Sequence, residues 1–240
     1  MPLVFAVLGL LVATAELYLE PLLLTHRLDD PERFRHVQRL PMVAHLLPAA
    51  QSESSTAAEV EGGPEDGGLW PFVLTTAIFQ LALAGTFAGL AWRLHAPWQI
   101  GLACAYSAIL FQIGLIDFHH RLVLNILSYP AAVLAVAGSL FWSGIGLGSS
   151  LLGGLIALAI FLVIEIAGRG AMGRGDSKLA AVIGLMRGIP GLWTALISGI
   201  LIGGVVALLL LVTGRSRKDT FAYGPWLAAG AILSFFLAPH

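Results

Sequence analysis

Long apolar runs dominate this chain and limit what it can fold into. Seven of them approach the roughly 20 residues that a helix needs to cross a bilayer, and they cover residues 3–24, 71–91, 98–116, 122–142, 149–167, 190–213 and 221–238. Charged residues make up 11% of the 240 positions, whereas soluble domains carry roughly 25%. So few charges cannot cover a water-facing surface. The sequence therefore predicts an all-α integral membrane protein.

A shorter apolar run, residues 177–189, decides how many spans we expect. At 1.5 Å per residue it would reach about 20 Å, so it predicts a short span or a half-helix. If it counts as a span, eleven of the thirteen Lys and Arg residues fall on one side of the membrane, leaving only Arg93 and Arg187 on the other. Without it, the bias weakens to eight against five. Because cytoplasmic loops are rich in Lys and Arg, we expect about eight transmembrane helices with both termini outside.

The polar segments suggest how the chain is organised. We expect a first span at residues 1–24, a partly disordered cytoplasmic loop at 25–70, and a transmembrane core at 71–240. The second half of the loop, residues 49–70, is acidic and rich in Ser, Ala and Gly, a composition that buries too little apolar surface to fold. No nucleic-acid partner is indicated, and the lipid bilayer is the expected surroundings of the core.

Several kinds of catalytic or metal site find no support in the sequence. Cys104 is the single cysteine and lies in an apolar run, which argues against a disulfide framework, a cysteine-based zinc site and a thiol nucleophile. Neither H-E-x-x-H nor G-x-S-x-G occurs, so the usual zinc-protease and serine-hydrolase signatures are missing. His119 and His120 could be imagined as metal ligands, but an interfacial cluster is the more ordinary interpretation. We therefore predict no metal and no cofactor.

Acidic residues in or beside the apolar runs are the most informative, because an ionised side chain in hydrocarbon is costly and tends to mark a function or a partner. They are Glu16, Glu20, Asp117, Glu165 and Asp176. The three glutamates are most simply explained by contacts with neighbouring helices or cations, such as Arg169 for Glu165 at helical spacing. The eight-span topology places both aspartates at the cytoplasmic boundary.

Two carboxylates that converge at such a boundary are the components of an aspartyl protease. Like charges at close range cannot both ionise, so one carboxyl holds a proton and the other acts as a base. The base can activate a water molecule while the acid polarises the scissile carbonyl.

The segment "GRGDSK" around the second aspartate allows two interpretations. Gly173 and Gly175 allow a sharp bend or a close approach of a substrate strand. Asp176 and Ser177 also stand where helix N-caps occur, so Asp176 could be a structural cap rather than a catalytic group. Lys178 could be a counter-charge for the aspartates or an interfacial cation.

Three segments together resemble the type IV prepilin peptidases, which belong to the GxGD membrane aspartyl proteases. "IDFHHRLVLN" is similar to the family's first aspartate segment, "GRGDSKLAAVIGLMRG" to its G-x-G-D-x-K-L segment, and "FAYGPWLAAGAI" to its closing element. The resemblance covers residues 71–238 and implies eight spans. It assigns the catalytic pair to Asp117 and Asp176. It assigns motif positions to Gly173, Gly175, Lys178, Asn125, Gly224 and Pro225.

Two departures from the family pattern refine this expectation. Leu124 stands where the family usually has proline, which could alter the chain beside the first aspartate. The first loop lacks the paired C-x-x-C motifs that bifunctional members use when they methylate the new amino terminus. The resemblance therefore implies a peptidase without a zinc-bound methylation module.

We expect a membrane endopeptidase that removes the basic leader from prepilin or pseudopilin precursors at the cytoplasmic face of the inner membrane. The alternative is a non-catalytic, degenerate homologue that helps to assemble a pilus or secretion system. A proton-coupled transporter fits poorly, because it would need acids near the membrane midplane, whereas Asp117 and Asp176 end their apolar runs.

Overall fold

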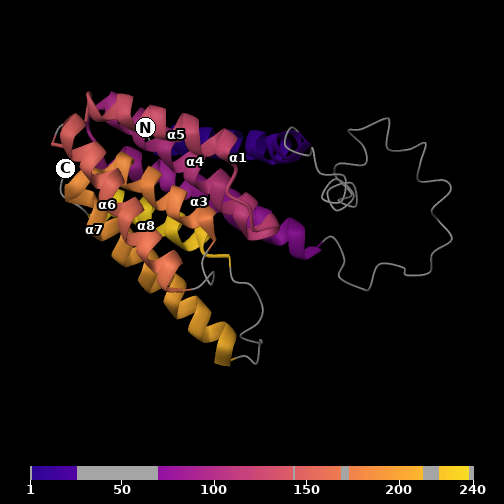
Figure 1. Cartoon of the computed structure of the whole chain (residues 1–240). Helices are drawn as coiled ribbons and strands as arrows, with labels where there is room; N and C mark the ends of the chain where they lie inside the picture. Colours follow the sequence, from indigo (N-terminus) through magenta and orange to yellow (C-terminus); the bar gives the residue numbers. More distant parts are fainter. Residues whose placement is uncertain (1, 26–69, 143, 169–172, 213–221, 238–240) are drawn as a thin grey trace, which may run out of the picture.

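A computed structural model describes residues 2–25, 70–142, 144–168, 173–212 and 222–237, and these fold entirely into helices and short connections (Figure 1). The helices are α1 (Pro2–Thr25), α3 (Trp70–Arg93), α4 (Pro97–His120), α5 (Asn125–Ser139), α6 (Gly146–Ala167), α7 (Arg174–Val212) and α8 (Gly224–Leu237). Each apolar run from the sequence forms a helix within this set. The predicted all-α architecture is therefore confirmed for the described residues.

Three helical segments within the described residues are long and apolar enough to cross a membrane: Pro97–His120, Gly146–Ala167 and Arg174–Leu210. Shorter apolar helices occur at Pro2–Ala15, Asn125–Ser139 and Gly224–Leu237. Large apolar side chains are exposed on the outside of the bundle, as with Leu155 at 62% and Leu201 at 62%. A surface of this kind is stable in lipid rather than in water. The number of eight spans remains a prediction.

The predicted loop at 25–70 lies outside the described residues apart from its two ends, which belong to α1 and α3. Arg169 and the cluster of cations at 215–218 lie outside them as well. The charge argument for the topology therefore stays an argument from sequence.

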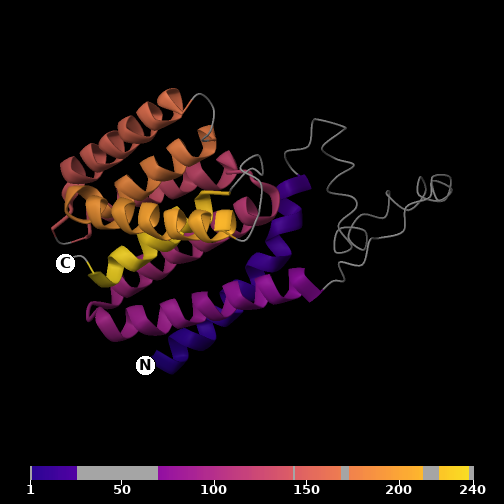
Figure 2. The same cartoon turned by 90° about the horizontal axis from the view of Figure 1, so that it is seen from below.

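The helices form one bundle in which α4 and α8 lie next to each other and α7 packs against α5, α6 and α8. α1 crosses α3 on the side of the bundle opposite α6 (Figure 2). The largest fully buried side chains, among them Tyr106, Phe161 and Phe235, fill the space between these helices. This arrangement brings the C-terminal end of α4 close to the N-terminal end of α8.

Small residues let the helix backbones approach closely. A Cβ on Gly184 would collide with the Gly153 carbonyl on α6, and a Cβ on Gly230 would collide with the Gly199 backbone on α7. Membrane helices commonly associate through such small residues, because lipid offers no hydrophobic drive and close packing must supply the attraction. The glycines therefore fix α6 and α8 against α7.

Helix α7 is broken at Gly188, whose φ of 56° and ψ of −172° lie far from helical values. That region of backbone conformation is essentially restricted to glycine. The break leaves the Ile189 N–H without a helical acceptor, and the Ser149 hydroxyl accepts it at 3.0 Å. Pro190 then stands in the first turn of the second arm, where proline needs no N–H partner. The first arm, 174–187, is about 21 Å long, which fits the expected short helical unit.

Candidate active site

Asp117 lies in the last turn of α4 and is buried, with 5% of its surface exposed. Its Oδ2 accepts a hydrogen bond from the backbone N–H of Gly224 at 3.0 Å. Gly224 is the first residue of α8, so this N–H is one that a helix leaves without an intrahelical partner. The start of α8 therefore supplies a donor to a carboxylate that is distant in sequence.

Gly224 leaves space that the Asp117 carboxylate needs. A Cβ at this position would lie 2.6 Å from Oδ2 and 2.9 Å from Cγ of Asp117. Pro225 follows and packs over α4, where a Cβ on Gly114 would lie 3.4 Å from the proline Cα. The two residues of the closing motif thus hold α8 directly against the helix that carries Asp117.

Asp176 lies in the first turn of α7 and is 8% exposed. Its carboxylate accepts a hydrogen bond from the backbone N–H of Gly173, while its own N–H donates to the Gly173 carbonyl at 3.0 Å. An acidic side chain that reaches back from the third helical residue is one half of a capping box. Asp176 therefore does not stand at the predicted N-cap but at the third helical position, and its bond to Gly173 fixes the direction of its carboxylate.

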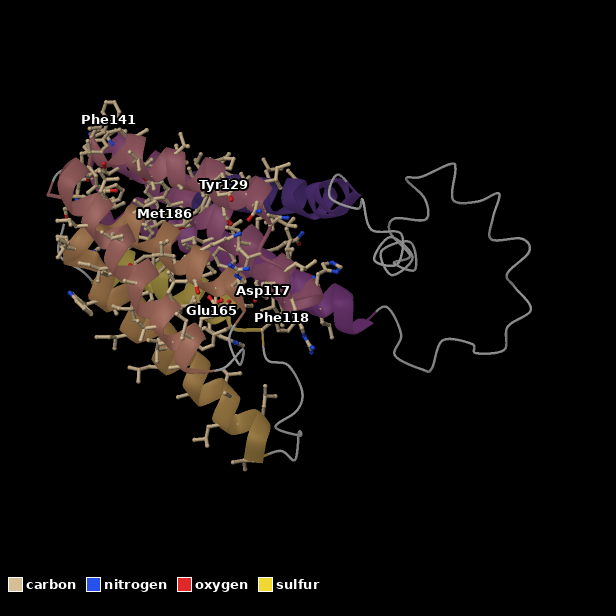
Figure 3. All side chains as sticks on the ribbon, in the orientation of Figure 1. Asp117, Phe118, Tyr129, Phe141, Glu165 and Met186 are labelled. Atoms are coloured by element: carbon tan, nitrogen blue, oxygen red, sulfur yellow. The ribbon has the colours of Figure 1, made fainter. Side chains whose placement is uncertain are left out.

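The two aspartates belong to one cluster of charges at one end of the bundle. Asp176 interacts electrostatically with Asp117 and with Glu165 on α6, and Tyr223 interacts with Asp176. Asp117 and Glu165 lie at the same end, while Phe141 marks the other end (Figure 3). The cluster is formed by four segments: the end of α4, the end of α6, the start of α7 and the residues before α8.

Two contacts join the chain segments that carry the aspartates. A Cβ on Gly175 would lie 2.8 Å from the Cβ of Val123, so this glycine lets the segment after Asp117 touch the first turn of α7. Nearby, the Lys178 ammonium donates to Asn125 Oδ1 at 2.9 Å. Lys178 is thus engaged with a residue of the other motif.

The backbone between these contacts turns sharply after α4. Arg121 adopts a left-handed conformation with φ of 54°, and its N–H donates to the Asp117 carbonyl at 2.8 Å. Leu124 then precedes α5 with φ of −78° and ψ of 129°. Proline fixes φ near −65°, so the leucine holds nearly the conformation that proline would impose. Leucine in place of the family's proline at position 124 therefore does not change the backbone conformation before α5.

Glu165 is predicted from the sequence to contact a neighbouring helix or a cation, with Arg169 as a candidate. Arg169 lies outside the described residues, and the described partners of Glu165 are Ser177 and Arg174 on α7. Neither partner follows from spacing along α6, because both belong to the next helix. A contact between helices is nevertheless one of the interpretations that the sequence favours for Glu165.

No group of three or more His, Cys, Asp or Glu side chains suited to a metal occurs among the described residues. The imidazole rings of His119 and His120 lie 6.2 Å apart between centroids. Two buried carboxylates beside two backbone N–H donors can divide one proton between them and activate water. This chemistry needs neither a metal nor a cofactor.

Residues 104–208 match the model of the type IV leader peptidase family, and this region contains both aspartates. A prepilin leader peptidase/N-methyltransferase of Xanthomonas campestris is 28% identical over 60% of this chain and 53% of its own length. The Bacillus subtilis protein of the same name is 28% identical over 65% of this chain and 63% of its own. The Pseudomonas aeruginosa protein is 26% identical over 80% of this chain and 63% of its own.

The chain spans between about half and two thirds of the length of these relatives. No solved structure matches it significantly. The matched region includes the segments around Asp117 and Asp176, and it ends before the segment around Gly224. The region that contains Asp117 and Asp176 is therefore similar to the type IV leader peptidase family.

Proposed function

We propose that this protein is a membrane aspartyl endopeptidase that removes the basic leader from prepilin-like precursors. Asp117 and Asp176 are the catalytic pair. The observation that carries the proposal is the geometry of this pair: two buried carboxylates from different helices in one electrostatic cluster, each with a backbone N–H donor. The names of the relatives support leader removal as the reaction.

The mechanism follows from the proximity of the carboxylates. One of them keeps a proton because two like charges in a buried site repel each other. The ionised carboxylate takes a proton from water, and the resulting nucleophile attacks the scissile carbonyl carbon. The protonated carboxyl donates to the carbonyl oxygen, and a proton is then delivered to the leaving amine. The Gly224 N–H stabilises negative charge on Asp117 through its hydrogen bond.

The substrate has a basic leader joined to an apolar helix of about 20 residues, the length that spans a bilayer. The leader stays in the cytoplasm, where the positive-inside rule assigns the Arg- and Lys-rich loops of this chain. In the eight-span topology, Asp117 and Asp176 lie at the cytoplasmic face of the inner membrane, and residues 25–70 form a cytoplasmic loop. The apolar helix of the substrate docks laterally from the bilayer.

The names of the relatives also include N-methyltransferase activity. We propose that this chain cleaves without a zinc-bound methylation module, because Cys104 is its single cysteine and lies buried within α4. A zinc site of paired C-x-x-C motifs needs four thiolates.

Cleavage of a purified precursor tests the proposal. The full chain and a pilin-like precursor are reconstituted together in liposomes, and the products are identified by mass spectrometry. We expect cleavage at the junction of leader and apolar helix, loss of cleavage in Asp117→Asn and in Asp176→Asn, and no added methyl mass with S-adenosylmethionine. An intact precursor in the presence of folded wild-type protein would favour the assembly factor instead.

A further inference from the structure

We propose that Glu165 is a positioning residue for Asp176: it orients the first turn of α7 through Ser177, and its negative charge helps the aspartate pair to keep a proton. The inference rests on the proposed peptidase function. It adds a third carboxylate to the site, one that lies on α6 and belongs to none of the three sequence motifs.

The contact between Glu165 and Ser177 is short and partly buried. The Ser177 hydroxyl donates to Glu165 Oε2 at 2.7 Å, and Ser177 is 2% exposed. Arg174 Nε approaches Oε1 at 3.8 Å, but the Arg174 side chain is 92% exposed. Exposed ion pairs contribute little because water screens them. The hydroxyl bond is therefore the contact that fixes Glu165 to the residue next to Asp176.

Helix α6 holds the first arm of α7 at its other end as well. The Ser150 hydroxyl donates to the Leu185 carbonyl at 2.7 Å, and the Gly153 and Gly184 backbones pack directly against each other. Side chains on such packed helices are located more accurately than those on loops. Glu165 therefore links the first turn of α7, which carries Asp176, to the rigidly packed helix α6.

The charges around Asp176 are predominantly negative. Asp117 on α4 and Glu165 on α6 interact with it electrostatically, and the uncharged phenol of Tyr223 before α8 interacts with it as well. Arg174 and Lys178 are the cations in the first two turns of its own helix; Arg174 is 92% exposed and Lys178 donates to Asn125. Arg121 interacts electrostatically with Asp117. A further carboxylate near the pair disfavours the state in which both aspartates are ionised.

Variants separate the two parts of this role. Glu165→Gln keeps an oxygen that can accept from Ser177 but removes the charge, so we expect kcat at the optimum to fall less than in Ser177→Ala. Because the pair then loses its last proton more easily, the alkaline limb of the pH profile moves to lower pH by roughly half to one unit. Ser177→Ala keeps the charge but loses the bond. It should lower kcat about three- to tenfold with KM unchanged and the profile in place.

Glu165→Ala should combine both effects, and Arg93→Gln serves as the matched control. Arg93 is an exposed charge at the end of α3 remote from Asp117, so its removal should leave the profile unmoved. An unmoved profile in Glu165→Gln, or a shift in Ser177→Ala as large as that in Glu165→Gln, would overturn the inference.

A measurement that does not need cleavage distinguishes failure of the inference from failure of the proposed function. The protonated-carboxyl infrared band of Asp176 is assigned by its disappearance in Asp176→Asn and titrated in the intact protein. We expect the band to be lost at lower pH in Glu165→Gln than in the wild type. The same titration in both proteins would overturn the role of Glu165 whether or not the protein cleaves a precursor.

Discussion

At the scale of single residues, Gly224 contributes space and a donor rather than a side chain. We predict that Gly224→Ala abolishes most of the leader cleavage, because its Cβ would lie 2.6 Å from Asp117 Oδ2 and displace the carboxylate. A displacement of about 1 Å in a catalytic group can cost roughly a hundredfold in rate. Cleavage rates in liposomes check this prediction.

Gly101→Ala is the control for this variant, since nothing lies within 4 Å of a Cβ placed there and the residue is on the same helix as Asp117. Its cleavage rate should equal that of the wild type. Normal cleavage by Gly224→Ala would show that a Cβ at position 224 does not displace the Asp117 carboxylate from its working position.

The hydrogen bond between Lys178 and Asn125 should couple the two aspartate segments. We predict that Lys178→Met and Asn125→Leu each reduce cleavage several-fold, and that the double variant is hardly worse than either single one. A coupling energy of about 0.5–1.5 kcal/mol is expected for such a bond. Asn125→Asp keeps an acceptor for Lys178 and should lose less activity than Asn125→Leu. If the losses of cleavage in the two single variants simply add in the double variant, the 2.9 Å bond between Lys178 and Asn125 does not contribute to catalysis.

The motif residues around the aspartates could be named from the sequence because each motif is continuous. The contacts between these residues could not be predicted from the sequence. The bond between Gly224 and Asp117 joins positions 107 residues apart, and no periodicity reports which helices become neighbours. Ser177 and Glu165 lie on different helices, so the spacing rules that apply within one helix could not pair them.

At the scale of the elements, restoring the family's proline at position 124, just before α5, tests whether Leu124 impairs the site. We predict that Leu124→Pro folds and keeps cleavage within a few-fold of the wild type, because φ at this position is already −78°. The Leu124 N–H donates no hydrogen bond to the described residues, so proline removes none. Loss of the buried leucine should be largely offset by the stiffer backbone, leaving the unfolding free energy within about 1–2 kcal/mol.

Thermal unfolding in detergent and the liposome cleavage assay measure both quantities for Leu124→Pro. If the variant folds but loses cleavage, the site requires a backbone conformation at residue 124 that proline cannot adopt.

The break in α7 depends on one glycine. We predict that Gly188→Ala lowers stability by about 1–3 kcal/mol, because its backbone conformation strains any residue with a Cβ. The added Cβ would also lie 2.8 Å from both the Ile145 Cγ2 and the Ser149 hydroxyl. Gly204→Ala, on the second arm with open space around it, should be neutral in thermal unfolding experiments. Equal stability of the two variants would indicate that α7 does not bend at Gly188.

The apolar patterns predicted the positions of these helices well because burial in lipid depends on local composition. They also indicated a short helical unit at 177–189, which corresponds to the first arm of α7. The exact break was harder to predict. It combines a glycine conformation with a hydroxyl from α6, and only the second arm's Pro190 signals it in sequence.

At the scale of the whole molecule, α8 packs against both α4 and α7, and Asp176 interacts electrostatically with Asp117. Composition alone predicts the membrane class, since few charges and long apolar runs leave no soluble alternative. The orientation of the chain in the membrane depends on the charges of the loops, and most of these lie outside the described residues. The eight-span topology therefore rests on the charge pattern of the sequence.

The most direct test of the catalytic pair compares the cleavage rates of Asp117→Asn, Asp176→Asn and the double variant. All three are reconstituted with a pilin-like precursor, and folding is verified by thermal unfolding. Groups that act as one unit lose nearly everything when either is removed. We therefore predict that each single variant falls at least roughly a thousandfold, to the same residual rate as the double variant. Substantial cleavage by either single variant would contradict the assignment of Asp117 and Asp176 as one catalytic site.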